Sequence, residues 1–276
     1  MARAPGLYIL DFDGTFTDVE REAIPFLAAY RRGLVEILDV GPLDAVWDRA
    51  LAHVRRAPDE HGFVYESKIV APSHADPYIL ATSVAHRVLE ELSLSHRAPE
   101  LEPLFGRAYA ESDTVFRPDA GEVLEAVLGR GAPVYVVSNS HTGSVRKKLE
   151  LLDRTALARL EVIGDAKKFH LTAPEPSDAA FEAVPETLDV AGLSRPIYLR
   201  RGRYYERLRA IWQATGTGPS DTLVCGDIFE LDLALPAALG ADVHLVGRSS
   251  TPAWEQDAVR SRGGSFSLAL SGLLSR

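Results

Sequence analysis

The 276-residue sequence has few of the features that mark secreted, membrane-spanning or metal-cluster proteins. Its single cysteine, Cys225, excludes an intramolecular disulfide and a zinc site built from cysteines. No apolar run approaches the length of a membrane span, and the N-terminus lacks the apolar stretch of a signal peptide. The eight histidines show no paired spacing that would place two metal ligands on one helix face. We therefore expect a soluble, cytoplasmic protein.

Positive charge is also scarce. Lys and Arg together number 30 against 39 Asp and Glu, which gives a net charge of −9. This balance argues against a nucleic-acid binder and against a protein that binds acidic membranes. The 46% hydrophobic and 25% charged residues are those of an ordinary globular protein, and the chain is long enough for one large domain with a second one inserted. The composition says nothing about the oligomeric state.

Short apolar runs that stop at polar residues indicate strands covered on both faces. The strongest are residues 7–10, 134–137 and 222–225, and residues 162–163 and 243–246 are weaker candidates. Helical patterns lie between them, with apolar residues recurring at helical spacing near residues 123–128 and 145–152. Strands that alternate with helices predict an α/β fold with a doubly wound parallel sheet.

Residues 19–116 differ from the rest of the chain. They hold helix-like stretches at 24–38, 43–54 and 77–92 and few β-rich runs. The sequence therefore predicts a core domain of residues 1–18 and 117–276 with a helical insert at 19–116. A second interruption at 172–196 is rich in proline and acidic residues, and we expect a loop-rich excursion with one short helix there.

Each of the three strongest strands ends in a small polar cluster. The clusters are Asp11-x-Asp13-Gly14-Thr15, Ser138-Asn139, and Gly226-Asp227 with Asp232 five residues later. Ligands of open parallel sheets bind beyond the carboxyl ends of the strands, so we expect these clusters to form one site.

Carboxylates in such a site fit phosphoryl transfer. Asp11 can attack a phosphoryl group and form an aspartyl-phosphate, while Asp13 protonates the leaving oxygen and then activates water. A phosphate dianion would be repelled by bare carboxylates, which predicts Mg²⁺ held by Asp11, the backbone carbonyl of Asp13 and Asp227. Ser138 and the N–H groups that follow it can hold the phosphoryl oxygens. Thr15 and Asn139 are candidate substrate-binding residues.

With these clusters the sequence resembles the haloacid dehalogenase-like (HAD) hydrolase superfamily. The first HAD motif appears as Asp11-Phe12-Asp13-Gly14-Thr15, and the second as VYVVSN ending at Ser138. The fourth appears as Gly226-Asp227 followed by Asp232, and FRPDAGEVLEAVLGRGAPVYVVSNS resembles the approach to the second motif. The resemblance implies a Rossmann-like core with a C1-type helical cap at the insert. It also implies phosphatase or phosphotransferase chemistry, because the second aspartate of the first motif, which dehalogenases lack, is present here as Asp13.

The third HAD motif, a lysine shortly before the fourth, has no clear counterpart. The expected region reads RPIYLRRGRYYERL and holds only arginines, of which Arg201 or Arg203 could supply the positive charge of this motif. Arg201 is also a candidate substrate-binding residue. Lys167 and Lys168 lie earlier, directly after the weak strand at 162–163. We favour the lysine pair over the arginines, and both alternatives stay open at this point.

Simpler explanations exist for each cluster taken alone. Asp-Gly is a common turn dipeptide, and Ser138-Asn139 could merely cap the next helix. Together the clusters predict a Mg²⁺-dependent hydrolase that releases phosphate from a small phosphorylated metabolite. A phosphomutase or phosphotransferase acting on a sugar phosphate would use the same residues, and a non-catalytic phosphate-binding module is the third possibility. The physiological substrate is not encoded in a recognisable pattern.

Overall fold

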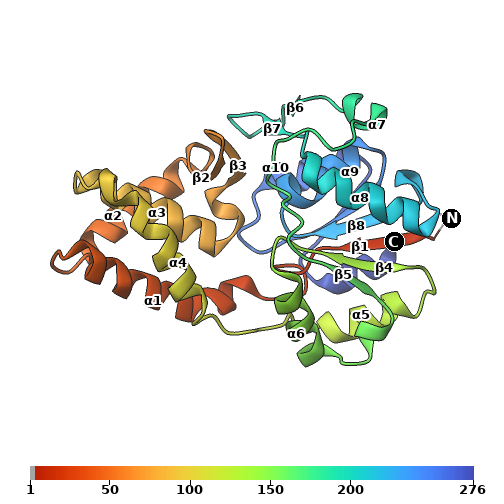
Figure 1. The fold of residues 1–276 in the computed structure, drawn as a ribbon, viewed down its shortest axis with the longest axis horizontal. Coiled ribbons are helices and arrows are strands. Elements are labelled where there is room, and N and C mark those ends of the chain that lie inside the picture. The colour runs from red at the N-terminus through yellow and green to blue at the C-terminus, as the bar shows by residue number, and fades with distance from the viewer. Residues whose placement is uncertain (1–3) are drawn as a thin grey trace. The chain divides into compact units, whose positions relative to one another are not determined.

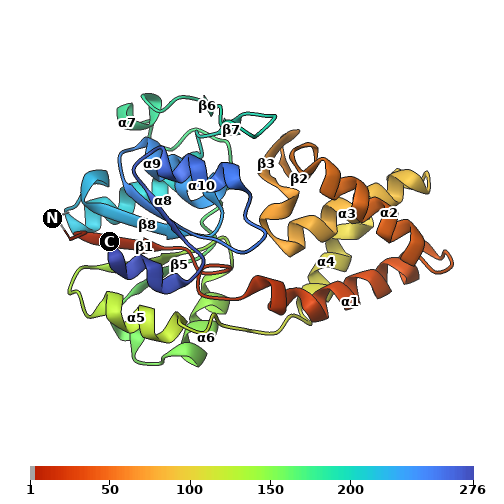
Figure 2. The ribbon, with the colours of Figure 1, turned by 180° about the vertical axis from the view of Figure 1, so that it is seen from behind.

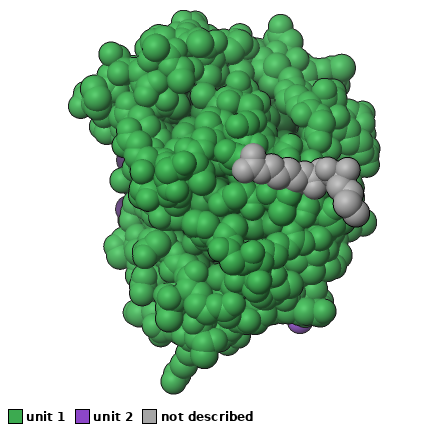
Figure 3. Space-filling view, turned by 90° about the vertical axis from the view of Figure 1, so that its right-hand side faces the viewer, with its two compact units in different colours: residues 1–17, 116–276 green, residues 18–115 purple. Residues whose placement is uncertain are grey.

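The computed structural model describes residues 4–276, which form two compact units. Among these residues, one unit comprises 4–17 and 116–276, and the other comprises 18–115; they are green and purple in Figure 3. Each unit has its own hydrophobic core.

The first unit is built on a six-stranded sheet in the order β10-β9-β8-β1-β4-β5 (Figure 1). All five strand pairings in it are parallel. Its strands are β1 (Leu7–Leu10), β4 (Val134–Val137), β5 (Glu161–Ile163), β8 (Thr222–Gly226), β9 (Asp242–Val246) and β10 (Ser265–Ser267).

Helices cover both faces of this sheet, as Figures 1 and 2 show from opposite sides. The side chains of β1 pack into two hydrophobic cores, one on each face of the sheet. Leu7 and Ile9 lie in one core and Tyr8 and Leu10 in the other, because successive side chains of a strand point to opposite faces. The helices are α5 (Ala120–Leu128), α6 (Thr142–Leu152), α8 (Gly202–Thr215), α9 (Ala234–Ala238) and α10 (Ala253–Arg260). The predicted doubly wound parallel sheet is thus confirmed.

The strand order reverses direction at β1. The chain runs outward from β1 to β4 and β5 on one side, then returns to β8 next to β1 and continues to β9 and β10 on the other. The carboxyl ends of β1, β4 and β8 therefore meet at a topological switch point, where ligands bind in open α/β sheets.

The excursion after β5 contains more structure than expected. It holds the four-residue helix α7 (Ala179–Glu182) and an antiparallel pair of two-residue strands, β6 (Thr187–Leu188) and β7 (Ile197–Tyr198). A five-residue π-helix, Phe229–Leu233, follows β8 and was not predicted either.

The second unit is mainly helical, with the helices α1 (Val19–Leu38), α2 (Asp44–Arg56), α3 (Pro77–Glu91) and α4 (Leu101–Tyr109). It also contains an unpredicted antiparallel hairpin of β2 (Gly62–Tyr65) and β3 (Lys68–Pro72). Its two-residue turn, Glu66-Ser67, has φ values of 47° and 63°, as type I′ turns require. Asn-Gly or Asp-Gly usually marks such a turn, so Glu-Ser gave no signal in the sequence.

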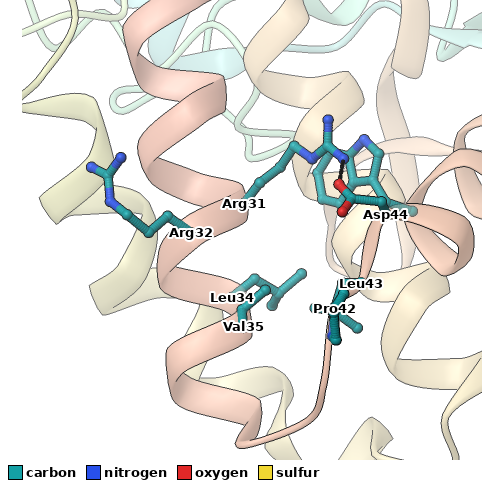
Figure 4. A pocket seen from close by; sticks show the side chains of 8 residues that line it. Arg31, Arg32, Leu34, Val35, Pro42, Leu43 and Asp44 are labelled. Carbon is teal, nitrogen blue, oxygen red and sulfur yellow. Dashed lines mark hydrogen bonds and ion pairs between the residues drawn. The ribbon is translucent and has the colours of Figure 1, made fainter.

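A hollow of about 190 Å³ lies between α1 and α2 (Figure 4). Arg31 reaches across it to Asp44 at 2.6 Å and lies 5.3 Å from the centre of the Trp47 ring. Arg32 turns away and pairs with Glu111 at 3.2 Å. Both guanidinium groups thus have carboxylate partners.

Within residues 4–276, no helix combines the length and apolar character that crossing a membrane requires.

Candidate active site

Asp11 is the first residue after β1, and its side chain is nearly buried. Its backbone N–H donates to the carbonyl of Cys225 at 2.8 Å, which ties the end of β1 to β8. One carboxylate oxygen, Oδ1, lies 2.7 Å from Lys168 Nζ, and the other accepts a hydrogen bond from Thr15 Oγ1 at 3.0 Å. Burial raises the pKa of Asp11 to about 7, and the Lys168 ammonium opposes this shift.

Lys168 holds two carboxylates together. Its Nζ lies 2.7 Å from Asp11 and 2.8 Å from Asp232 Oδ1, and the side chain is only 1% exposed. The ammonium also lies 5.5 Å from the centre of the Tyr204 ring. Burial alone would lower the pKa of Lys168, but the two carboxylates raise it above its usual value. Lys168 is therefore a charged lysine fixed at the switch point.

The structure distinguishes Lys167 from Lys168, which the sequence alone could not do. Lys167 is exposed and has a left-handed backbone with φ 51°, whereas Lys168 turns inward to Asp11. Arg203 pairs with Glu206 at 3.2 Å on the surface of α8. Of the two predicted lysines, the structure thus brings Lys168 to Asp11 and leaves Lys167 exposed.

Arg201 does not take the predicted substrate-binding position. It is fully buried, and its guanidinium donates to the carbonyls of Tyr198 at 2.9 Å and Lys168 at 3.0 Å. It also lies 3.3 Å from the carboxylate of Glu230. The guanidinium is thus engaged with protein groups behind the lysine, which corrects the prediction.

Asp13, two residues after Asp11, has different partners. Its Oδ2 accepts a hydrogen bond from Ser138 Oγ at 3.0 Å, and Ser138 Oγ in turn accepts from the N–H of Ser140 at 2.9 Å. Its Oδ1 lies 3.2 Å from Lys148 Nζ. With 26% of its side chain exposed, Asp13 is more open to solvent than Asp11. The loops after β1 and β4 therefore meet at this carboxylate.

Lys148 is a site residue that the sequence motifs do not mark. It lies on α6 between Val145 and Leu149, which are both buried. A lysine on the apolar face of an amphipathic helix was the available signal, since such a side chain points toward the sheet. Only the docked helix shows that its ammonium reaches Asp13.

The two remaining predicted substrate contacts support other site residues. Thr15 donates to Asp11, as described above. Asn139 Oδ1 accepts a hydrogen bond from the backbone N–H of Lys168 at 2.8 Å. Both side chains thus hold Asp11 and Lys168 in place.

Three buried carboxylates gather at the switch point. Asp11, Asp227 and Asp232 each offer an oxygen atom, and these oxygens all lie within 4.8 Å of one another. Asp232 Oδ2 accepts from the N–H of Ile228 at 3.0 Å, and Asp227 lies 3.7 Å from the guanidinium of Arg248.

Gly14 allows the close approach of two of these elements. Its φ of 84° is in the left-handed region, and a Cβ atom built on it would overlap the carboxylate of Asp227. Only glycine therefore fits between the loop after β1 and the end of β8.

The donor set suits a hard divalent cation. Carboxylate oxygens are the ligands Mg²⁺ prefers, and Asp11, Asp227 and Asp232 each offer one within 4.8 Å of the others, in addition to their contacts with Lys168 and Arg248. Asp232 is a member of this cluster that the predicted ligand set lacked. The side chain of Asp13 is not a member of this cluster.

Solved structures provide the comparison with known proteins. No family model and no curated protein matches the sequence. A Haemophilus somnus protein described as a predicted phosphoglycolate phosphatase is similar over 100% of this chain and 99% of its own, with TM-score 0.56 and 14% identity. YfnB from Bacillus subtilis, described as a HAD hydrolase bound to magnesium, covers 99% and 98%, with TM-score 0.54 and 14% identity.

A third structure is a haloacid dehalogenase-like hydrolase from Streptococcus pneumoniae. It covers 99% of this chain and 97% of its own, with TM-score 0.51 and 12% identity. At these identities the likeness concerns the fold. The chain therefore has the fold of the HAD-like hydrolases, as its motifs predicted.

Proposed function

We propose that this protein is a phosphatase that releases inorganic phosphate from a small phosphorylated metabolite through an aspartyl-phosphate. The observation that carries the proposal is the setting of Asp11. Its buried carboxylate is held between Lys168 Nζ at 2.7 Å and Thr15 Oγ1 at 3.0 Å, directly beside Asp227 and Asp232. A carboxylate fixed in this way is oriented to act as a nucleophile.

The environments of Asp11 and Asp13 support different roles. Asp11 is buried and held by a cation, as suits a nucleophile that must stay in one orientation. Asp13 is partly exposed and hydrogen-bonded to a hydroxyl, as suits a group that exchanges protons with the substrate and water. Two carboxylates in unlike surroundings are a recurrent basis for dividing nucleophile and acid/base roles.

The reaction then follows from these residues. An Asp11 oxygen attacks phosphorus, and Asp13 gives its proton to the leaving alcohol oxygen. Asp13, now ionised, takes a proton from water, which attacks the aspartyl-phosphate and releases inorganic phosphate. Ser138 and the N–H groups of the loop before α6 hold the phosphoryl oxygens. Lys168 keeps Asp11 in place and offsets the negative charge of the acidic cluster.

Asp11, Asp227 and Asp232 would hold the Mg²⁺ ion, with the Asp13 carbonyl as a further ligand. When bound, the ion supplies positive charge that offsets the repulsion between the phosphate and the carboxylates. We expect chelation with EDTA to abolish hydrolysis and added Mg²⁺ to restore it. Hydrolysis that continues unchanged in EDTA would contradict this part of the proposal.

The defining experiment screens phosphate monoesters with Mg²⁺ and measures released phosphate. We expect Asp11→Asn to abolish turnover, because an amide oxygen cannot form the aspartyl-phosphate, and to leave the circular dichroism spectrum unchanged. Asp257→Asn is the control, since that side chain is 74% exposed on α10. Full activity in Asp11→Asn would refute the mechanism.

Product analysis separates the other possibilities. An isomeric sugar phosphate in place of free phosphate would identify a phosphomutase. Binding of beryllium trifluoride that depends on Asp11, without turnover of any ester, would identify a non-catalytic phosphate-binding module.

A further inference from the structure

Two fully buried charged side chains behind the site have no part in the reaction proposed above. Arg201 and Glu230 are each 0% exposed and lie 3.3 Å apart. Arg195 adds two further contacts to Glu230, at 3.0 Å and 2.7 Å. The attraction within a buried ion pair often only offsets the cost of removing its charges from water, so stability alone does not account for this cluster.

Arg201 holds the backbone of Lys168. The carbonyl of Lys168 accepts from Arg201 Nη1 at 3.0 Å, and its N–H donates to Asn139 at 2.8 Å. Lysine has a flexible four-carbon stem, so its ammonium stays in place only if its backbone is fixed as well. Arg201 and Asn139 thus secure the lysine from both sides.

The same guanidinium connects the lysine to the acidic segment after β8. Glu230 precedes Asp232 by two residues in the π-helix, and Asp232 is the second carboxylate bound by Lys168. Lys168 and the π-helix are therefore linked twice, directly and through Arg201 and Glu230. Tyr204, one turn further along α8, donates to the carbonyl of Asp232 at 3.0 Å.

The charges of this cluster balance. Three cations and three anions are connected in sequence: Arg195, Glu230, Arg201, Lys168, Asp11 and Asp232. The connection between Arg201 and Lys168 is the hydrogen bond to the carbonyl, and the others are ion pairs. Loss of Arg201 would leave an excess of buried negative charge behind the nucleophile.

We propose that Arg201 is a positioning residue for catalysis, which fixes Lys168 and is itself held by Glu230 and Arg195. This inference rests on the proposed phosphatase function. Arg195 and Arg201 both lie in the segment between β5 and α8. This segment then fixes the backbone of Lys168, whose ammonium binds Asp11.

The test measures hydrolysis of 4-nitrophenyl phosphate with Mg²⁺ by the full-length protein. We expect Arg201→Met to lower kcat about 100-fold with KM nearly unchanged, because a displacement of about 1 Å in a catalytic group has that effect. Arg201→Lys should recover part of the loss, since it keeps the charge opposite Glu230.

Arg200→Met is the matched control. Arg200 is the preceding residue, and its guanidinium donates to the carbonyls of Val184 and Glu182 at 2.8 Å and 2.9 Å. Like Arg201, Arg200 donates to backbone carbonyls. Its acceptors belong to the segment between β5 and α8, whereas Arg201 also binds the carbonyl of Lys168. We expect this variant to lose thermal stability while keeping the wild-type kcat.

Arg195→Met supplies a second test that does not depend on the folding of Arg201→Met. It leaves Glu230 paired with Arg201, so the protein should fold, and kcat should fall by a smaller factor without a change in KM. Wild-type kcat in both Arg195→Met and Arg201→Met would overturn the inference, as would an equal loss in Arg200→Met. A wild type that hydrolyses no phosphate ester would instead overturn the proposed function, and this inference with it.

Discussion

Lys148 contacts Asp13 although no sequence motif marks it, and this contact can be tested directly. We expect Lys148→Met to lower kcat about tenfold, because Asp13 loses the cation that fixes one of its oxygens at 3.2 Å. The pair is partly exposed, so the free energy of unfolding should change by less than about 1 kcal/mol. Steady-state kinetics and urea unfolding measure the two effects.

Lys147→Met is the control for this variant. Lys147 is the adjacent residue of α6 and is exposed. An equal loss of kcat in both variants would show that Lys148 acts through helix stability or general surface charge, and not through Asp13.

Gly14 provides a second residue-level test. We expect Gly14→Ala to abolish activity, because the added Cβ would displace the carboxylate of Asp227. Gly131→Ala is the control: its φ is 78°, but a methyl group there would have no atom within 4 Å among the described residues. Both variants should lose about 1–2 kcal/mol of stability from the left-handed backbone, measured by urea unfolding. Activity retained in Gly14→Ala would contradict the close approach.

The sequence could place some site residues and not others, for physical reasons. Asp11, Ser138 and Asp227 follow buried strands directly, so the strand pattern alone places them at one edge of the sheet. Lys168 could not be distinguished from Lys167, because the distinction depends on the left-handed conformation of Lys167. The burial of Arg201 depends on Glu230, which is remote in sequence.

At the level of elements, unbroken runs of apolar residues were enough to predict the central strands. The predicted runs at 7–10 and 134–137 coincide with β1 and β4, since strands covered on both faces are apolar throughout. Strand β10, Ser-Phe-Ser, has no such run and could not be predicted. It depends on pairing with β9, which brings Ser265 opposite His244.

This pairing predicts an acid-sensitive edge of the sheet. His244 is buried on β9, and its two ring nitrogens lie 2.7 Å and 2.9 Å from the hydroxyls of Ser265 and Ser267. Burial, with a contribution from Arg276, lowers the pKa of His244 to about 4. The unfolded chain takes up this proton near pH 6.5, whereas the folded protein resists until about pH 4.

The stability contributed by neutral His244 is therefore fully present above about pH 6.5 and is lost as the pH falls toward 4. The loss should reach at most about 3 kcal/mol, measured as the shift in urea unfolding between pH 7.5 and pH 4.5. We expect His244→Gln to reduce this loss and the exposed His96→Gln to leave it unchanged. An identical loss in His244→Gln and wild type would contradict the assignment.

For the whole molecule, the division into two units has a direct consequence for folding. The insert has a core of its own, built from α1, α2, α3 and α4 around residues such as Leu34 and Val84. Its two ends meet, because the N–H of Asp18 donates to the carbonyl of Val115 at 2.8 Å. The helical stretches were predictable from periodicity, whereas the hairpin was not.

We expect residues 18–115 to fold when expressed alone. Trp47 is 5% exposed in this unit and is its one tryptophan, so its fluorescence should be blue-shifted and should shift to the red on unfolding in urea. Val84→Asp should abolish this transition, since it places a charge in the core. A red-shifted emission and a disordered circular dichroism spectrum for the unmodified fragment would contradict independent folding.

The bridge between Thr17 and Phe116 adds a practical consequence. These residues lie on the sheet-bearing unit at the two points where the chain leaves it and returns. A tight turn could join them after excision of everything between, leaving the strand order untouched. The same junction could accept a foreign module whose two ends lie close together, so it is a defined position at which chimeras can exchange the insert.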